Sequence, residues 1–465
     1  MGMTAVKPQT ETPPRIATVP LAPARKAPQW RLWGSRLSFS LADPGTTLSA
    51  GLAVNVLLAR WLPAEQYGAF VLVFGLFLLL AGLHNALLLE PMSLFDPAHD
   101  PRGFADYFEA QIWVHLALTA VLAVPLLLCG ALLALFTRNS YLAGAFFGAG
   151  VALPFILLLR FARRMCHILQ RPAIALAGNI CNLVFLLAGL LALQARHKLT
   201  PSHVFLVLGF SCLCAALLLF HKLQIGLDES RECSVSWRSA AAENWRYGRS
   251  LVGGALASTL VGQSAIVLAP MFLGLAGAAR FYAMQVPALV MLQCASAAGM
   301  LLLPGFARES FLGNGKRVRQ LAHQVSLSLA GVSLLVAAIL YFTAALLERL
   351  LFGGKFAATA WLIPWLLAIP LAAGFASGYS MVLRALKRPQ RDLLATGIAA
   401  AVAFQSAFLF MPLWGLAGAA ASLASGYVLH AAVVYVCFRQ ATANERTEFA
   451  AQSTEEIAPL EQFNT

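Results

Sequence analysis

Four basic side chains follow one another at helical spacing in the first half of the chain. Arg160, Arg163, Arg164 and His167 occupy positions i, i+3, i+4 and i+7, which places them on one face of a helix. They follow an apolar run, so this basic face lies at the end of a predicted membrane-spanning helix. Such a cluster either meets anionic lipid headgroups or binds an anionic ligand. Both interpretations stay open.

Amide and imidazole side chains lie inside apolar runs, where a lipid-facing helix would not need them. Each could bind hydroxyl groups of a ligand, or could only join helices by a hydrogen bond. These side chains are Asn55, His84, Asn85, Asn179, Asn182, Gln263, Gln285 and Gln293.

Two cations and two acids stand at the ends of apolar runs. Arg60 and Arg280 lie at outer ends, where they either extend to the interface or meet an anionic ligand as it leaves. Asp43 and Glu90 lie near inner ends, where they could carry a coupling ion, H+ or Na+, or form salt bridges with basic neighbours. No catalytic residue, metal site or cofactor is predicted.

The composition is that of a polytopic membrane protein. Hydrophobic residues make up 59% of the 465 residues, charged residues only 11%, and the mean hydropathy is +0.73. A soluble domain carries roughly 25% charged residues. The net charge of +13 is scattered over the ends of apolar runs, so it does not indicate nucleic-acid binding.

The apolar runs predict an all-α fold of about twelve transmembrane helices. We place them at 38–62, 69–89, 111–136, 141–160, 172–194, 202–221, 250–275, 281–305, 322–347, 358–384, 392–411 and 414–437. The last two are separated only by Pro412, Leu413 and Trp414, so their boundary is the weakest.

The distribution of basic residues predicts that both termini face the cytosol. With that orientation, 26 of the 33 Lys and Arg residues fall in inner segments and 7 in outer ones. This is the bias that the positive-inside rule expects. The segment 90–110 is an exception, since it is mainly acidic.

The chain divides into two similar halves between two tails. Leu169-Gln-Arg-Pro172 recurs as Leu386-Lys-Arg-Pro389, at an offset of 217, and Thr47-Leu48 recurs as Thr259-Leu260, at an offset of 212. The offsets favour a parallel repeat of six spans. We therefore predict a disordered basic tail (1–36), a first lobe (37–223), a cytoplasmic linker (224–249), a second lobe (250–438) and a cytoplasmic tail (439–465).

Three segments resemble a known family of transporters. They are Leu57-Leu-Ala-Arg-Trp-Leu-Pro-Ala-Glu-Gln-Tyr-Gly-Ala-Phe70, His84-Asn-Ala-Leu-Leu-Leu-Glu-Pro91 and Tyr247-Gly-Arg249. They are similar to the polysaccharide-biosynthesis (Wzx-like) flippases of the MOP exporter superfamily. The resemblance implies two six-helix lobes around a central cavity of alternating access in the bacterial inner membrane. The cargo would be an oligosaccharide linked to undecaprenyl diphosphate, for exopolysaccharide, O-antigen or capsule.

This resemblance gives the polar residues their expected roles. The diphosphate requires cations, for which Arg160, Arg163, Arg164, Arg60 and Arg280 are candidates, and the sugars require the amides and His84. Partners would be membrane lipids, a coupling ion, and a polysaccharide polymerase or export machinery.

Two other classes of protein are alternatives to this interpretation. A polymerase or ligase would be expected to carry a sizeable outer loop, which the span pattern does not leave, so we expect a transporter and not an enzyme. Gly313-Asn-Gly-Lys316 lacks the first glycine and the hydroxyl residue of a phosphate-binding loop. The stronger alternative is a MATE-like multidrug or small-molecule antiporter coupled to a cation.

Overall fold

The computed structural model describes residues 49–94, 104–137, 139–223, 236–312, 315–386 and 389–457. In these ranges all regular elements are helices, and nine of them are long and apolar enough to cross a membrane. The expectation of an all-α polytopic membrane protein is confirmed. Asp43 and the basic tail 1–36 lie outside the described residues.

The first half of the chain forms helices that closely follow the predicted spans. A first helix over 49–61 ends before Pro63, and α2 (Ala64–His84) begins directly after this proline. A π-helix, η1 (Asn85–Leu89), and the short α3 (Glu90–Met92) continue α2. The remaining helices of this half are α4 (Phe104–Phe136), α5 (Ser140–Ile168), α6 (Pro172–Ala195) and α7 (Pro201–Leu223).

The second half contains longer helices. It consists of α8 (Trp237–Phe311), α9 (Gly315–Phe352), the 3-10 turn η2 (Ala357–Thr359), α10 (Leu362–Leu366), α11 (Ala368–Ala385) and α12 (Pro389–Ile457). Helix α8 begins 13 residues before the predicted span at 250, inside the predicted linker, and α12 extends into the predicted C-terminal tail.

Helices α8 and α12 each contain two predicted spans, divided by one glycine. Gly274 has φ 70° and Gly415 has φ 58°, a backbone region that side chains with a Cβ rarely adopt. The same six residues, Gly-Leu-Ala-Gly-Ala-Ala, begin at both positions. The backbone of Gly418 lies against the carbonyl of Phe410, eight residues earlier, so the chain reverses there. One short sequence therefore makes both breaks.

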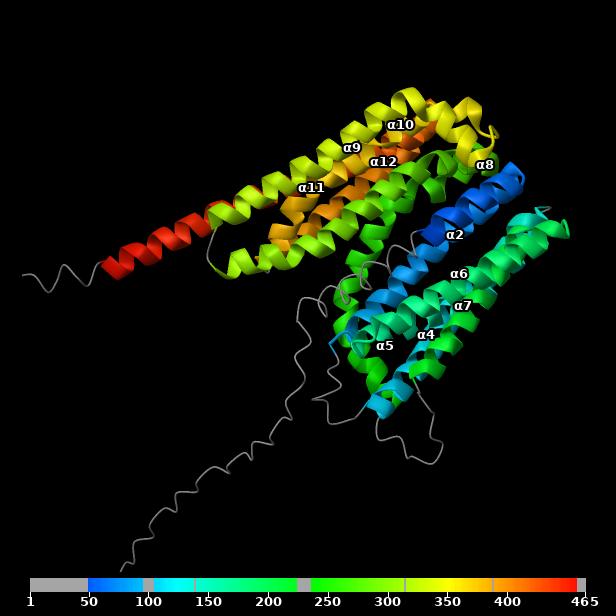
Figure 1. Ribbon diagram of the computed structural model, residues 1–465, viewed down its shortest axis with the longest axis horizontal. Coiled ribbons are helices and arrows are strands. Elements are labelled where there is room, and N and C mark those ends of the chain that lie inside the picture. Colours follow the sequence, from blue (N-terminus) through cyan, green and yellow to red (C-terminus); the bar gives the residue numbers. More distant parts are fainter. Residues whose placement is uncertain are drawn as a thin grey trace, which may run out of the picture.

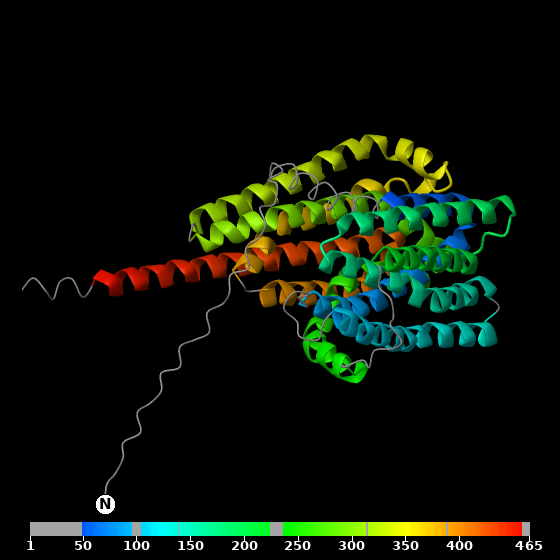
Figure 2. The same cartoon turned by 60° about the horizontal axis from the view of Figure 1, so that its bottom comes forward.

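The helices lie in two groups that diverge toward one end (Figure 1). One group contains α2 and α4 to α7, and the other contains α9, α11, α12 and the later part of α8. Helix α8 joins the groups, because it packs against both α2 and α12. The view turned by 60° shows the helices running lengthwise in both groups (Figure 2).

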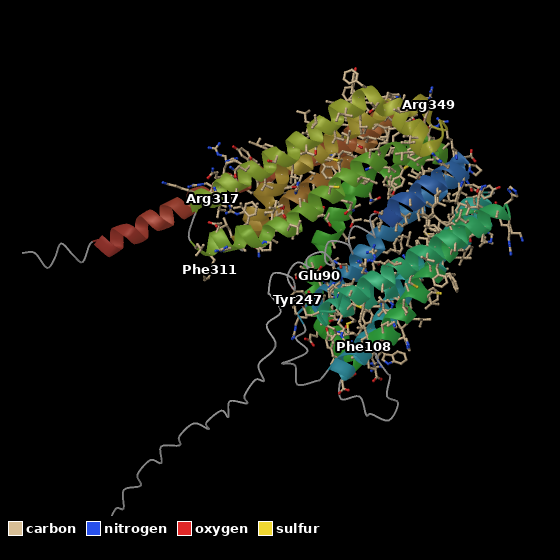
Figure 3. The ribbon with its side chains drawn as sticks, in the orientation of Figure 1. Glu90, Phe108, Tyr247, Phe311, Arg317 and Arg349 are labelled. Carbon is tan, nitrogen blue, oxygen red and sulfur yellow. The ribbon has the colours of Figure 1, made fainter. Side chains whose placement is uncertain are left out.

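We call the end that carries Ile168, Phe311 and Ala385 the inner end, since the sequence predicts it to be cytosolic. There the two groups lie well apart: Phe311 and Arg317 are on one side, and Glu90, Phe108 and Tyr247 are on the other (Figure 3). Close contacts at the opposite, outer end are described below.

Small residues let neighbouring helices approach closely within the first group. A Cβ atom on Gly148 of α5 would lie 2.7 Å from the carbonyl oxygen of Ser202 on α7. A Cβ on Gly209 of α7 would lie 2.9 Å from the Cβ of Ala152 on α5. Close backbone packing at small residues stabilises helix pairs where lipid offers no hydrophobic driving force.

The count of twelve spans and the orientation remain predictions. The first span is described only from Ser49 onward. The breaks at Gly274 and Gly415 divide two of the nine apolar helices, as the span pattern requires.

Cysteine accessibility tests the topology. Ser140→Cys and Ala358→Cys, both exposed at the outer end, should react with an impermeant maleimide in intact cells. Arg317→Cys and Gln390→Cys, exposed at the inner end, should react only after the membrane is permeabilised. The background should lack the exposed Cys129 and Cys294. Labelling of Arg317→Cys in intact cells would contradict the proposed orientation.

Candidate functional site

Two neighbouring cavities share lining residues, one among helices of the first half of the chain and one between that half and α8. The smaller, of 180 Å³, lies among the first helix, α2, α5, α6 and α7. The larger, of 470 Å³, lies among the first helix, α2, α5 and α8. Gly51, Asn55, Phe74 and Arg163 line both cavities, so these residues form one connected compartment.

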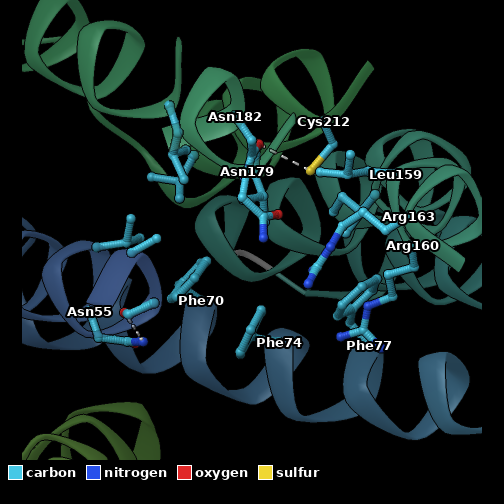
Figure 4. Close-up of a pocket in the computed structure, with 17 residues that line it drawn as sticks. Asn55, Phe70, Phe74, Phe77, Leu159, Arg160, Arg163, Asn179, Asn182 and Cys212 are labelled. Carbon is cyan, nitrogen blue, oxygen red and sulfur yellow. Dashed lines mark hydrogen bonds between the residues drawn. The ribbon is translucent and has the colours of Figure 1, made fainter. Parts of the chain in front are cut away.

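Helical spacing sets the polar side of the smaller cavity. Arg160 and Arg163 stand one turn apart on α5, and Asn179 and Asn182 stand one turn apart on α6. Arg163 points into the space between Asn179 and the rings on α2 (Figure 4). Cys212 of α7 donates to Asn182 Oδ1 at 3.4 Å. Guanidinium and amide groups therefore project together into this compartment.

The opposite side of the smaller cavity is aromatic. Phe70, Phe74 and Phe77 form a row on α2, with ring centroids 5.6 Å and 5.8 Å apart between successive members. Figure 4 shows this row facing Arg160 and Arg163. The cavity thus has a cationic side and an apolar side.

The larger cavity adds amide and hydroxyl groups from the second half of the chain. Gln263, Tyr282 and Gln293 of α8 face Asn55 and Arg163 of the first half. The Asn55 Nδ2 atom donates to the Gly51 carbonyl at 2.8 Å, which fixes the amide against its own helix. The larger cavity therefore has walls from both halves.

The charge of the compartment is positive. Among the described residues that line the two cavities none is acidic, and Arg160 and Arg163 are the charged ones. Guanidinium groups with low water access attract phosphate strongly and bind it through paired hydrogen bonds. The arrangement suits an anionic ligand and opposes a cationic one.

Three predicted residues lie together outside the compartment. Arg164 donates through Nε to the Leu89 carbonyl at 3.0 Å, and its terminal nitrogen lies 3.4 Å from Glu90 Oε1. Asn85 Nδ2 donates to the same carboxylate oxygen at 3.1 Å. Glu90 thus pairs with Arg164, and this cluster connects α5 to the end of the π-helix.

The other predicted residues separate into different environments. His84 is fully buried and contacts His115. Gln285 is 1% exposed and lines neither cavity. Arg280 is exposed and also lines neither. Of the predicted ligand-binding residues, the compartment brings together Asn55, Arg160, Arg163, Asn179, Asn182, Gln263 and Gln293.

Arg60 takes part in a reciprocal contact at the outer end, which we call the outer clamp. Its Nε donates to the Leu351 carbonyl at 2.6 Å, and a terminal nitrogen donates to the Leu350 carbonyl. In return, Lys355 Nζ donates to the Ala59 carbonyl at 2.8 Å and to the Leu62 carbonyl. The last carbonyls of a helix lack partners within it and carry partial negative charge. Each cation therefore satisfies the end of the other helix.

The turn after α9 places Lys355 for this contact. Gly353 and Gly354 have φ of 70° and 83°, and the Gly353 amide donates to the Arg349 carbonyl at 2.9 Å. The fully buried Glu348 accepts from the Phe356 amide at 2.8 Å, which fixes the far side of the turn. Burial lowers the pKa of the Lys355 ammonium from its usual value.

Tyr282, His115, Lys355 and Glu348 were not among the residues predicted from sequence. His115 and Glu348 had a readable signal, since each interrupts an apolar run. A polar residue inside such a run usually has a function or a partner. Tyr282 and Lys355 gave no such signal in the sequence, because aromatic and basic residues are common at the ends of membrane spans.

The fold is that of known transporters, although no family model and no curated protein matches the chain. It is similar to a multidrug resistance MATE family transporter of the MOP superfamily in an inward-facing conformation, with TM-score 0.70, 15% identity and coverage of 86% of this chain and 96% of that one. It is also similar to the lipid II flippase MurJ in an inward closed conformation, with TM-score 0.67, 12% identity and coverage of 88% and 91%.

A third structural neighbour is a MOP superfamily transporter from Pyrococcus furiosus, described as having a binding pocket of reverse polarity that suggests a different function. It matches with TM-score 0.64, 13% identity and coverage of 89% of this chain and 96% of that one. The expected MATE/MOP-like fold is therefore confirmed. Sequence identities of 12% to 15% support the fold, but not the narrower assignment to Wzx-like flippases.

Loss of the outer clamp should favour separation of the outer ends. Combining Arg60→Ala with Lys355→Ala removes hydrogen bonds from charged donors, and even about 1 kcal/mol shifts a two-state equilibrium roughly fivefold. Spin labels at Ser140 and Ala358 should show a larger population at long distances. Arg280→Ala, an exposed outer cation outside the clamp, is the control. An unchanged distance distribution in the double variant would refute the clamp.

Proposed function

We propose that this chain is a flippase that moves undecaprenyl-diphosphate-linked oligosaccharide across the bacterial inner membrane by alternating access, for the synthesis of exopolysaccharide, O-antigen or capsule. The observation that carries the proposal is the compartment with two guanidinium groups, several amides and no acid among its described lining residues. An anionic, hydroxyl-rich headgroup needs this combination to leave water. The sequence resemblance and the fold of the solved neighbours support it.

Each wall of the compartment matches one part of such a headgroup. Arg163 lines both cavities and is the cation best placed to hold the diphosphate, with Arg160 one turn away. Asn55, Asn179 and Gln263 replace water around sugar hydroxyls. The aromatic row on α2 covers apolar surface of the ligand. The lipid tail stays in the bilayer through a lateral gap.

The outer clamp supplies one step of alternating access. While the outer ends are together, the guanidinium of Arg60 is held by the carbonyls at the end of α9. When these ends separate, Arg60 loses those partners at the outer mouth. It can then meet the diphosphate as the headgroup leaves, which is the role that the sequence predicts for it.

A MATE-like multidrug or small-molecule antiporter coupled to a cation is the alternative, and one structural neighbour is a multidrug MATE transporter. A site for cationic drugs or coupling ions requires acidic groups. The described lining of the compartment offers none, which favours the flippase. Loss of surface or secreted polysaccharide on gene deletion, with accumulation of the lipid-linked precursor, would support the flippase. Altered drug resistance alone would support the antiporter.

Substitution of Arg163 tests the anion site. Arg163→Gln should lower polysaccharide export by roughly ten- to a hundredfold, because a charged hydrogen bond is worth about 1.5 to 3 kcal/mol. Arg163→Lys should retain part of the export, since it keeps the charge and loses the planar fork. Export and precursor are measured at matched protein abundance. Arg308→Gln, an exposed arginine outside both cavities, is the control.

If Arg163→Gln at normal abundance exports at the rate of the unmodified protein, the compartment is not the diphosphate site. The basic face at Arg164 and His167 then becomes the next candidate.

A further inference from the structure

A buried pair of histidines lies beside the cationic compartment. His84 of α2 is 0% exposed and His115 of α4 is 1% exposed. His84 Nε2 lies 3.0 Å from His115 Nδ1, with the two rings nearly perpendicular at 86°. The Phe161 ring of α5 covers His115, with centroids 5.4 Å apart. Both imidazoles are therefore shielded from lipid and water.

The partners of the pair determine where its protons are. The backbone carbonyl of Pro154 on α5 faces the His115 ring, whose Nδ1 already faces His84. Because a carbonyl only accepts hydrogen bonds, its place favours the His115 tautomer that carries its hydrogen on Nε2. In a neutral pair His115 Nδ1 then accepts from His84 Nε2–H.

This assignment leaves one ring nitrogen ready to accept a proton. His84 Nδ1 bears a lone pair in the neutral pair, and it is buried without a hydrogen-bond partner. Protonation there preserves both existing hydrogen bonds. A π-helix also begins at Asn85, directly after His84. Such irregular turns inside helices occur frequently at functional sites.

Among the described residues, Arg160 in the wall of the compartment is the cation that acts electrostatically on His84. On α8, Ala255 and Thr259 lie against Gly82, and Gly248 lies against Ala86; none of these is charged, and Arg249, next to Gly248, is exposed. The Arg164 and Glu90 pair lies toward the inner end of α5 and neutralises itself. Burial disfavours a charge on His84 most, and the positive charge of Arg160 adds to that effect unless an anion offsets it.

We propose that the His84–His115 pair is a proton-binding site whose occupancy is linked to anion binding through Arg160. The linkage rests on the proposed function, because the ligand diphosphate is the anion that offsets Arg160. With the compartment empty, an imidazolium at His84 faces an uncompensated guanidinium and the pair stays neutral. When an anion binds Arg160 and Arg163, one proton from the solution binds at His84 Nδ1. By thermodynamic linkage the proton strengthens anion binding by the same factor.

The first experiment needs no ligand. Protein in nanodiscs with 15N-labelled histidine is titrated by NMR, and His84→Gln and His115→Gln identify the signals of the pair. Arg160→Gln removes the facing charge, so the protonation midpoint of the pair should rise by about one pH unit or more. His323, which lies 3.0 Å from the Tyr379 hydroxyl in the other group of helices, is an internal control and should not shift. An unchanged midpoint of the pair in Arg160→Gln would overturn the proposal.

The second experiment measures the linkage with UDP-glucose, a soluble diphosphate diester whose own charge is constant between about pH 5 and 8. Binding at saturation to weakly buffered protein should take up about half a proton per chain for a shift of about one pH unit, at the pH midway between the two midpoints, read by a pH-sensitive dye. His84→Gln should bind without this uptake. Binding to the unmodified protein without uptake would overturn the proton site and leave the flippase standing. Absence of binding would count against the anion compartment, and the ligand-free titration would still decide the proton site.

Discussion

Two cations that exchange partners at the outer end hold the arrangement on which the rest of the structure depends. Arg60 at the end of the first helix binds the carbonyls that end α9, and Lys355 after α9 binds the carbonyls that end the first helix. The unpaired carbonyls at the end of a helix attract cations. Because each cation binds the end of the other helix, both sets of carbonyls gain hydrogen-bond partners in the same contact. With the outer ends tied, the two groups of helices diverge toward the inner end (Figure 1).

The divergence lets one compartment take walls from both halves of the chain. Arg163 and Asn55 of the first half face Gln263 and Tyr282 of α8 across it. Movement of one group against the other must then remodel the site, while Arg160 and Asn179 move together within one group. The proposed anion recognition by α5 and α6 is thus separable from the contacts with α8 that would change on opening.

Sequence periodicity predicted the helices and the basic face of α5, but not the partners of that face. Arg160, Arg163 and Arg164 share one face in projection, yet only the first two reach the cavities, because Arg164 meets Glu90 at the start of α3. The spacing of residues along α5 cannot show which helix packs against this face, because that depends on the tertiary structure. Lys355 was hidden for the same reason, since its partners lie almost 300 residues away. The repeated Gly-Leu-Ala-Gly-Ala-Ala was readable in sequence and is the clearest missed signal.

The two breaks at Gly274 and Gly415 bear on how the protein is made. Each leaves only a short connection between its two spans, with Arg280 as the one charged residue in the first connection and none in the second. A backbone exposed in hydrocarbon with unpaired amides is strongly unfavourable. We therefore expect the two spans of each pair to enter the bilayer together, as a helical hairpin. The second half of the chain thus enters the bilayer in larger units than its number of spans implies.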